Sequence, residues 1–349
     1  MSGRPRLAFL GLGWIGRHRL EAIHHAGRAG IAMLCDPSTD AVASASALVP
    51  AAMTGTTMDD ILARADDLDG VVIASPSALH ASQSIAALEA GLAVFCQKPL
   101  GRNAPETRAV VAAARAADRL LAVDLSYRHT AAMQAIRPLL QQGDLGEIFA
   151  VDLTFHNAYG PDKPWFYDAR LSGGGCVIDL GVHLVDLALW CLDGQRVTGV
   201  TAQLFAGGRP LPHRTGDDAA AVEDFAAVTL TLEKGTVVRL ACSWKLPAGR
   251  DAVIGAAFYG TGGGAAMRNL GGSFYDFTAE RFDGTAAQAL ASPPDDWGGR
   301  AATDWAARLA DGAGFDPDCE RLVTLAEVLD RIYAGGVDVR EQARPGTVD

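Results

Sequence analysis

The sequence predicts a two-domain α/β protein, with a doubly wound parallel sheet in residues 1–124 and an α+β domain with a large, mainly antiparallel open sheet in residues 125–349. Three observations predict this fold class. Up to residue 124, short apolar strands alternate with helix-like segments. A glycine-rich turn follows the first strand directly. After residue 124, long alternating segments follow one another with few helices between them. A chain of 349 residues is also long enough for two cores.

The composition is that of a soluble globular protein, with 49% hydrophobic and 20% charged residues. The formal net charge of −11 and the absence of a basic run argue against a nucleic-acid partner or an anionic membrane surface. We expect no signal peptide, because the N-terminal apolar residues lead straight into a glycine loop. We expect no membrane span, because no apolar run reaches about 18 residues. The six cysteines form no C-x-x-C pair, so we expect reduced thiols in a cytoplasmic protein.

The first predicted strand, Arg6–Leu10, leads directly into a G-x-G-x-x-G turn and then into a helix that reaches Ala26. In this strand–turn–helix context the motif indicates a Rossmann dinucleotide-binding domain. Its three glycines would, in order, permit a tight turn, let the backbone approach a pyrophosphate, and allow the helix to pack closely on the strand. The candidate cofactor contacts of this turn are Gly11, Gly13, Trp14, Ile15 and Gly16.

A second strand, Ile31–Cys35, ends in Asp36, twenty residues after Gly16. An acidic residue at this place binds the ribose hydroxyls of the adenosine and repels a 2′-phosphate. The sequence therefore favours NAD. Arg17, Ser38 and Thr39 lie close enough in sequence to leave NADP as the second choice.

The alternation continues with predicted helices at 58–65, 82–90 and 107–117 and strands at 71–74, 93–96 and 120–123. Ligands bind at the carboxyl ends of such strands, so the residues that follow them are further candidates for cofactor contact. These are Ser75, Pro76, His80, Gln97 and Lys98. His80 could equally cap the next helix. Lys98 precedes a proline and could hydrogen-bond a substrate oxygen, or be a surface lysine at a strand end.

The second half is dominated by predicted strands at 147–157, 197–206, 222–233, 236–246, 253–260, 265–270 and 273–282. Lys234-Gly235 indicates a hairpin between two of them. Helices would cover one face of this antiparallel sheet. The other face would lie open and lean apolar, which favours a homo-oligomer built through the sheet.

A glycine triplet, Gly173–Gly175, reads as a flexible approach to an apolar helix beginning near Val177. Four polar or aromatic residues recur along one face of that helix. They are Asp179, His183, Asp186 and Trp190. Burying an unpaired carboxylate or imidazole is costly, so the helix carries either a buried structural pair or a functional site. The aromatic-rich loop before it, residues 156–171, could wall a pocket for a ring-shaped ligand or simply be anchored by its rings.

The chain resembles the glucose–fructose oxidoreductase/inositol dehydrogenase/MocA family in four motifs and in their order. These are the glycine turn, a strand ending in Lys98-Pro99, the Tyr127-Arg128 pair and the G-G-G-x-x-x-D-x-x-x-H-x-x-D helix. The resemblance covers nearly the whole chain. It implies that Lys98, Asp179 and His183 form the catalytic set, that the cofactor is NAD or NADP, and that dimers or tetramers form through the C-terminal sheet. The family's glutamate before the lysine is Gln97 here, which keeps the size and loses the charge.

The resemblance implies the interconversion of a secondary alcohol and a ketone on a small sugar, sugar acid or cyclitol, with hydride passing to or from nicotinamide. His183 would act as general base, since the ordinary histidine pKa of about 6.5 suits that role. Lys98 would bind the same oxygen and stabilise its developing negative charge. Asp179 would hold a neighbouring hydroxyl or orient the site. The candidate substrate contacts are Tyr127, Arg128, Asn157 and Trp165.

Two other interpretations are considered. The same fold could serve as a non-enzymatic NAD-binding sugar sensor, because fold does not determine function; the intact catalytic set argues against this. Asp179, His183 and Asp186 could instead bind a metal. We expect no metal, since no second histidine or cysteine has a helpful spacing, and we expect structural roles for Asp186 and Trp190.

Overall fold

The computed structural model describes residues 4–212 and 221–335, which form two compact units. The N-terminal unit contains the residues up to Ser126 together with Trp297–Thr324. The C-terminal unit contains Tyr127–Asp296 and the residues from Leu325 onward. The first boundary lies within two residues of the expected one. Segment 297–324, expected in the C-terminal domain, instead belongs to the N-terminal unit.

The N-terminal unit holds a six-stranded sheet in which every neighbouring pair is parallel, in the order β3-β2-β1-β4-β5-β6. This is the strand order of a dinucleotide-binding Rossmann domain, and it confirms the predicted doubly wound sheet. The strands are β1 Arg6–Leu10, β2 Gly30–Cys35, β3 Met53–Gly55, β4 Gly70–Ile73, β5 Ala93–Cys96 and β6 Leu121–Val123. The helices are α1 Trp14–Ala26, α2 Thr39–Ser46, α3 Met58–Leu62, α4 Ser77–Glu89, α5 Ala104–Ala117 and α9 Arg300–Ala310.

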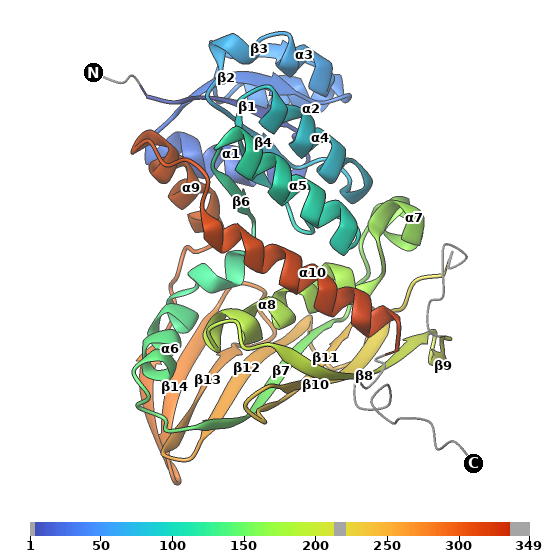
Figure 1. Ribbon diagram of the computed structural model, residues 1–349, viewed down its shortest axis with the longest axis vertical. Helices are drawn as coiled ribbons and strands as arrows, with labels where there is room; N and C mark the ends of the chain where they lie inside the picture. Colours follow the sequence, from blue (N-terminus) through green and yellow to red (C-terminus); the bar gives the residue numbers. More distant parts are fainter. Residues whose placement is uncertain (1–3, 213–220, 336–349) are drawn as a thin grey trace, which may run out of the picture. The chain divides into compact units, whose positions relative to one another are not determined.

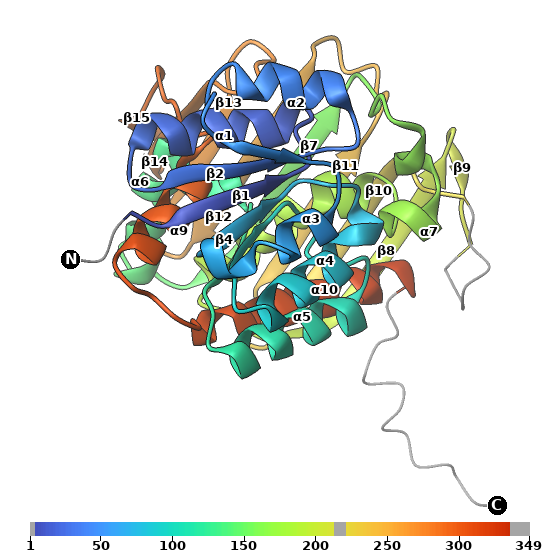
Figure 2. The same cartoon turned by 90° about the horizontal axis from the view of Figure 1, so that it is seen from above.

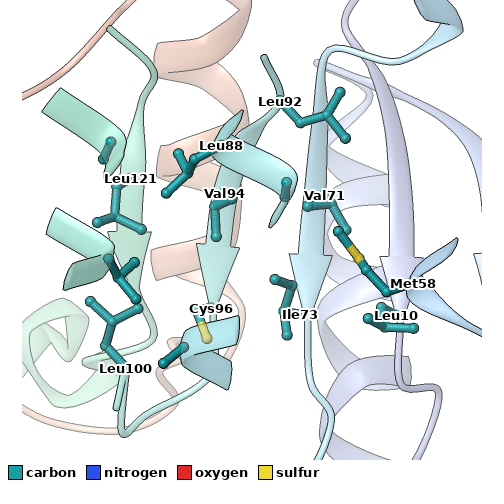
Figure 3. Packing of buried hydrophobic residues seen from close by; sticks show 14 of the residues in the cluster. Leu10, Met58, Val71, Ile73, Leu88, Leu92, Val94, Cys96, Leu100 and Leu121 are labelled. Atoms are coloured by element: carbon teal, nitrogen blue, oxygen red, sulfur yellow. The ribbon is translucent and has the colours of Figure 1, made fainter. Parts of the chain in front are cut away.

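Helices cover both faces of this sheet. Because successive strand residues point to opposite sides, the strands contribute to two separate core clusters. One cluster combines Val71, Val94 and their strand neighbours with α3, α4 and α5, and Figure 3 shows this packing from close by. The opposite cluster combines Phe9 and Phe95 with α1, α2 and α9. Figure 2 shows α1 and α2 on one side of the strands and α4 and α5 on the other.

Helix α9 explains why segment 297–324 joins the N-terminal unit. Its Trp305 is 1% exposed and packs against Phe95 of β5, with ring centroids 5.8 Å apart. The apolar face of this helix completes a core that the strands of residues 6–123 leave open on one side. This helix was not predicted from the sequence.

The C-terminal unit holds a nine-stranded sheet in the order β15-β14-β13-β12-β7-β11-β10-β8-β9. Among the described strands of this sheet, only the β7–β11 pair is parallel, which confirms a mainly antiparallel sheet. The turn at Lys234-Gly235 joins β10 to β11 as predicted. Its strands are β7 Ile148–Asn157, β8 Val197–Ala206, β9 Arg209–Pro210, β10 Phe225–Leu232, β11 Val237–Ser243, β12 Ala252–Gly260, β13 Gly263–Asn269, β14 Phe277–Asp283 and β15 Ala286–Ala291.

Helices α6 (Ala131–Gln141) and α8 (Val182–Cys191) cover one face of this sheet (Figure 1). The short helix α7 (Ala169–Ser172) lies between the aromatic-rich loop and the glycine triplet, and α10 spans Glu320–Tyr333. Residues Ala169–Cys191 form one helical stretch that by length and composition alone is apolar enough to cross a membrane, which the sequence analysis did not anticipate. Within the protein, 89% of its apolar window is buried, as in the core helix of a soluble fold.

Candidate active site

The glycine turn after β1 has two glycines that the fold itself requires. Gly11 has a φ of +89°, and a Cβ there would lie 2.5 Å from the carbonyl oxygen of Ala74. A Cβ on Gly16 would lie 2.0 Å from the carbonyl oxygen of Gly11. A Cβ on Gly13, in contrast, would meet nothing within 4 Å. Packing within the protein therefore does not explain Gly13, whereas a pyrophosphate approaching the N-terminus of α1 would.

The other two residues of this turn differ in exposure. The side chain of Trp14 is 69% exposed and stacks on His18, with ring centroids 5.8 Å apart, while Ile15 is half-buried. Their contact with a cofactor stays a prediction.

Asp36 is held in a defined orientation at the end of β2. Its Oδ2 accepts a hydrogen bond from the amide of Leu12 in the glycine turn (2.7 Å), and its Oδ1 accepts one from the amide of Ser38 (2.8 Å). Two of the three residues that left NADP open, Arg17 and Ser38, have partners within the protein. The Ser38 hydroxyl caps α2 by accepting from the amide of Ala41, and Arg17 bonds Glu21 at 3.0 Å.

His80 lies inside α4, because that helix begins at Ser77 after Pro76 rather than near residue 82 as predicted. Its ring is 1% exposed, with Nδ1 2.7 Å from the carbonyl oxygen of Pro99 and Nε2 2.7 Å from that of Ser75. Burial lowers the pKa of His80, and the nearby charge of Lys98 lowers it further. The hydrogen bonds to the two carbonyl oxygens raise this pKa but do not offset the effect of burial. His80 thus links the turns after β4 and β5 through its two ring nitrogens, and its contact with a cofactor stays a prediction.

Gln97 also has a partner that the sequence did not reveal. It is 7% exposed, and its Nε2 donates to Oδ2 of Asp124 at the end of β6. The same carboxylate accepts from Nε of Arg19 (2.5 Å) and from the hydroxyl of Ser126 (2.7 Å). The side chain of Gln97 therefore belongs to a buried network that joins α1 to two strand ends. Glutamine fits this place because its amide N–H donates a hydrogen bond to the carboxylate, whereas an ionised glutamate can only accept.

We expect Gln97→Glu to lower the free energy of unfolding by about 1–3 kcal/mol, because a second carboxylate would replace a donor beside Asp124. Adding Asp124→Asn should restore much of the loss, since one carboxylate again faces Arg19. Urea unfolding at neutral pH measures both. The exposed Gln288→Glu is the matched control and should change stability by less than about 0.5 kcal/mol. Equal stability of Gln97→Glu and the parent would contradict this role.

Lys98 follows β5 directly, at the carboxyl end of the parallel sheet. Its side chain is partly exposed, and its peptide bond to Pro99 is cis. Since β5 neighbours β4, Lys98 and the Ser75 turn lie on the same edge of the sheet, the edge where such domains bind ligands.

In the C-terminal unit, the glycine triplet is tightly packed, which corrects the expected flexible approach. A Cβ on Gly174 would lie 1.9 Å from the hydroxyl oxygen of Tyr333, and one on Gly175 would lie 1.9 Å from the carbonyl oxygen of Glu223. The buried Glu223 carboxylate accepts from the amides of Gly175 (3.0 Å) and Val177 (2.9 Å) and from the Tyr333 hydroxyl (2.9 Å). A carboxylate suits this place, because amides at a helix start attract negative charge.

The helix carrying Asp179 begins with a π-helical turn, Val177–Gly181, before α8. The predicted regular α-helical spacing is therefore wrong at this turn, because the wider turn changes the angle between Asp179 and the residues of α8. Asp179 is partly exposed, and its Oδ2 accepts from the indole Nε1 of Trp244 at 3.0 Å.

His183 lies beside Tyr127 in this unit. Its side chain is 7% exposed, and the two ring centroids are 4.9 Å apart. Tyr127 packs edge-on against Phe155 and Phe277. Burial raises the pKa of the Tyr127 hydroxyl, with smaller contributions from Tyr275 and the charge of Asp179. The unit thus groups an imidazole, a protonated phenol and a carboxylate.

Arg128, a predicted substrate contact, forms an ion pair with a buried carboxylate of α8. Its Nε donates to Oδ2 of the buried Asp186 at 2.8 Å, and a second bond joins the same two groups. Burial raises the pKa of Asp186, while the Arg128 charge opposes that rise. Trp190 packs under the guanidinium groups of both Arg128 and Arg137. Arg128 therefore forms an ion pair with Asp186 and packs on Trp190, and its contact with substrate stays a prediction.

Asn157 and Trp165 mark the start and middle of the aromatic-rich loop. Oδ1 of Asn157 accepts from the amide of Tyr159 at 2.7 Å, and Trp165 stacks on Phe166 at 3.8 Å. Both side chains are partly exposed, and their contact with substrate stays a prediction. Across residues 4–212 and 221–335, no three histidine, cysteine or carboxylate side chains are grouped so that they could hold a metal ion.

Comparison with known proteins agrees with this architecture. Residues 6–125 match the family model described as "Oxidoreductase family, NAD-binding Rossmann fold", and residues 133–266 match the "GFO/IDH/MocA C-terminal domain". A protein of Amycolatopsis mediterranei (strain S699) named for the oxidoreductase subunit of UDP-kanosamine synthase is 34% identical over 71% of each chain. D-glucoside 3-dehydrogenase of Escherichia coli (strain K12) is 30% identical over 57% of this chain and 58% of its own.

Among solved structures, levoglucosan dehydrogenase in complex with NADH aligns with a TM-score of 0.81 at 20% identity, over 96% of this chain and 99% of that one. This likeness supports the fold, and the two family models together match well over half of the chain. The chain therefore belongs to the GFO/IDH/MocA family of oxidoreductases, with an NAD-binding Rossmann domain followed by the family's C-terminal domain.

Proposed function

We propose that this protein is an NAD-dependent dehydrogenase or reductase that interconverts a secondary alcohol and a ketone on a small polyhydroxylated substrate, a sugar, sugar acid or cyclitol. The observation that carries the proposal is the grouping of Asp179, His183 and Tyr127 in the unit that follows an NAD-binding domain. Relatives named D-glucoside 3-dehydrogenase and inositol 2-dehydrogenase support this substrate class.

The proposed cofactor contacts fit NAD better than NADP. Gly13 leaves backbone open where a pyrophosphate would bind, and the oriented carboxylate of Asp36 suits ribose hydroxyls and repels a 2′-phosphate. Arg17 and Ser38 already have partners within the protein, so neither contact indicates a site for a 2′-phosphate. When bound, the nicotinamide accepts or donates the hydride.

The protein's own groups would manage the proton and the charge. In the oxidation direction, His183 takes the proton of the reacting hydroxyl, and Lys98 donates a hydrogen bond to that oxygen as negative charge develops. Asp179 accepts a hydrogen bond from a neighbouring hydroxyl. The proposed substrate contacts are Tyr127, Arg128, Asn157 and Trp165.

Absorbance at 340 nm tests this function with a panel of sugars, inositols and sugar acids, each offered with NAD and with NADP. We expect turnover of at least one class, faster with NAD. Tight NAD binding without turnover on the whole panel would instead favour a non-enzymatic sugar sensor.

We also propose that the protein forms a homodimer or homotetramer through the open face of the C-terminal sheet. This face carries several small side chains beside the Asp152–Arg239 ion pair, and a groove of about 610 Å³ is lined there by residues that include Thr154, Ala227, Thr229 and Ala241. An exposed face of this kind favours contact with a second copy. A location in the cytoplasm is part of the same proposal, since all six cysteines are buried thiols, which suits a reducing compartment.

We expect light scattering at micromolar concentration to give a mass of two or four chains. Ala227→Arg, which places a charge in the middle of the open face, should shift the protein toward monomer. Ala63→Arg on the surface of the N-terminal unit is the matched control and should leave the mass unchanged. A monomeric mass for the parent protein would contradict the proposal.

A further inference from the structure

Trp244, directly after β11, is bonded to a residue of the candidate active site. Its side chain is 2% exposed, and its indole Nε1 donates to Oδ2 of Asp179 at 3.0 Å. An indole has only this one donor, so its hydrogen-bonding capacity is committed to the carboxylate. The Trp244 backbone amide donates to the carbonyl oxygen of Asp224 at 2.7 Å, which fixes the base of the side chain.

The same indole packs against two aromatic rings of the aromatic-rich loop. The ring of Tyr167 meets it edge-on with centroids 5.6 Å apart, and that of Phe166 does so at 6.4 Å. Tyr167 is itself held at its ring and at its hydroxyl. Nζ of Lys245 lies over the ring, 4.8 Å from its centroid, and the hydroxyl donates to the carbonyl oxygen of Pro161 at 3.0 Å. One buried side chain thus contacts both the loop and Asp179.

The backbone around Trp244 is joined to the loop as well. The amide of Lys245 donates to the carbonyl oxygen of Tyr159 (3.2 Å), and the amide of Leu246 donates to the carbonyl oxygen of Asn157 (3.1 Å). Lys245 adopts a φ of +55°, an uncommon conformation for a residue other than glycine. A Cβ on Gly160 would lie 2.4 Å from the Tyr167 hydroxyl, so the loop is closely packed here.

We propose that Trp244 is a positioning residue that couples the aromatic-rich loop to the Asp179 carboxylate. The packing of Phe166 and Tyr167 determines where the indole lies, and the indole N–H determines where the carboxylate points. A substrate that fits the loop would thereby meet a correctly oriented Asp179, and a poorly fitting one would not. The effect on turnover rests on the proposed function, whereas the coupling itself does not.

Two variants separate the two contacts of the indole. Trp244→Phe keeps a ring against Tyr167 and removes the N–H, and Tyr167→Leu removes the ring and leaves the N–H. We expect each to lower kcat by about 10- to 100-fold, the range for a lost hydrogen bond to a charged group, while the KM for NAD stays unchanged. The double variant should lose no more than the worse single one, because both act through one chain of contacts.

Trp305→Phe, a buried indole in the other unit, is the matched control and should keep kcat within about twofold. A second readout needs no turnover: the solvent exchange rate of the Trp244 indole N–H, followed by NMR, should rise about tenfold in Tyr167→Leu. Parental kcat in Trp244→Phe, multiplied losses in the double variant, or an unchanged exchange rate would each overturn the coupling. If the parent turns over nothing on the whole panel, the proposed function fails, and the exchange rate still decides the coupling.

Discussion

Lys98→Met is expected to lower kcat about 100- to 1,000-fold while the Kd for NAD changes less than about threefold. Methionine keeps the length and the apolar stem of lysine but removes the ammonium group. The reacting oxygen would then develop negative charge without its donor, which affects the transition state more than the bound ground state. Steady-state rates with the best substrate of the panel, together with calorimetric titration of NAD, measure the two quantities separately.

The chain offers a matched control for this variant. Lys234 lies exposed in the turn between β10 and β11, and Lys234→Met makes the same chemical change away from any proposed contact. We expect it to keep the parental kcat. If Lys98→Met also keeps the parental rate, Lys98 does not bind the reacting oxygen.

His183→Asn is expected to lower kcat about 10²- to 10⁴-fold, again with little change in NAD binding. Asparagine fills a similar space beside Tyr127 and can hydrogen-bond, but it cannot take a proton at neutral pH. The ring of His183 is 7% exposed and close to Tyr127, so solvent has little access to replace it as a base. Initial rates across a range of pH, with a thermal melt to confirm folding, provide the measurement.

The exposed His25→Asn on α1 serves as the control and should leave kcat unchanged. A His183→Asn protein that is folded and fully active would remove His183 from the proposed mechanism. If Lys98→Met and His183→Asn both lose turnover but still bind NAD, then both residues serve the chemical step and neither is needed to bind NAD. That result would exclude the sensor interpretation.

Local rules predicted much of the fold. The strand–turn–helix motif around Gly11 and Gly16 was recognised from neighbouring residues alone, and the structure confirms it. The hairpin at Lys234-Gly235 was recognised in the same way and is also confirmed. The boundary at Ser126 agrees within two residues, whereas α9 was missed, since its apolar face completes a core formed about 200 residues earlier in the chain.

The candidate site was predicted less completely. The pairing of Arg128 with Asp186 was not predicted, and it offsets the cost of burying that carboxylate. The hydrogen bond from Gln97 to Asp124 was not predicted either. Residue type alone did not distinguish these roles, since each depends on which polar group the fold brings nearby.

The sequence by itself determined the fold class, the nucleotide-binding turn with Asp36, and the helix that carries Asp179 and His183. Each of these depends on a pattern within a short stretch of chain. Only the tertiary structure decided the partners: Glu223 with the glycine triplet, Trp244 with Asp179, and Gln97 with Asp124. Those pairs are separated by 48, 65 and 27 residues. A buried polar group must find a partner wherever folding brings one close, and no local spacing encodes that choice.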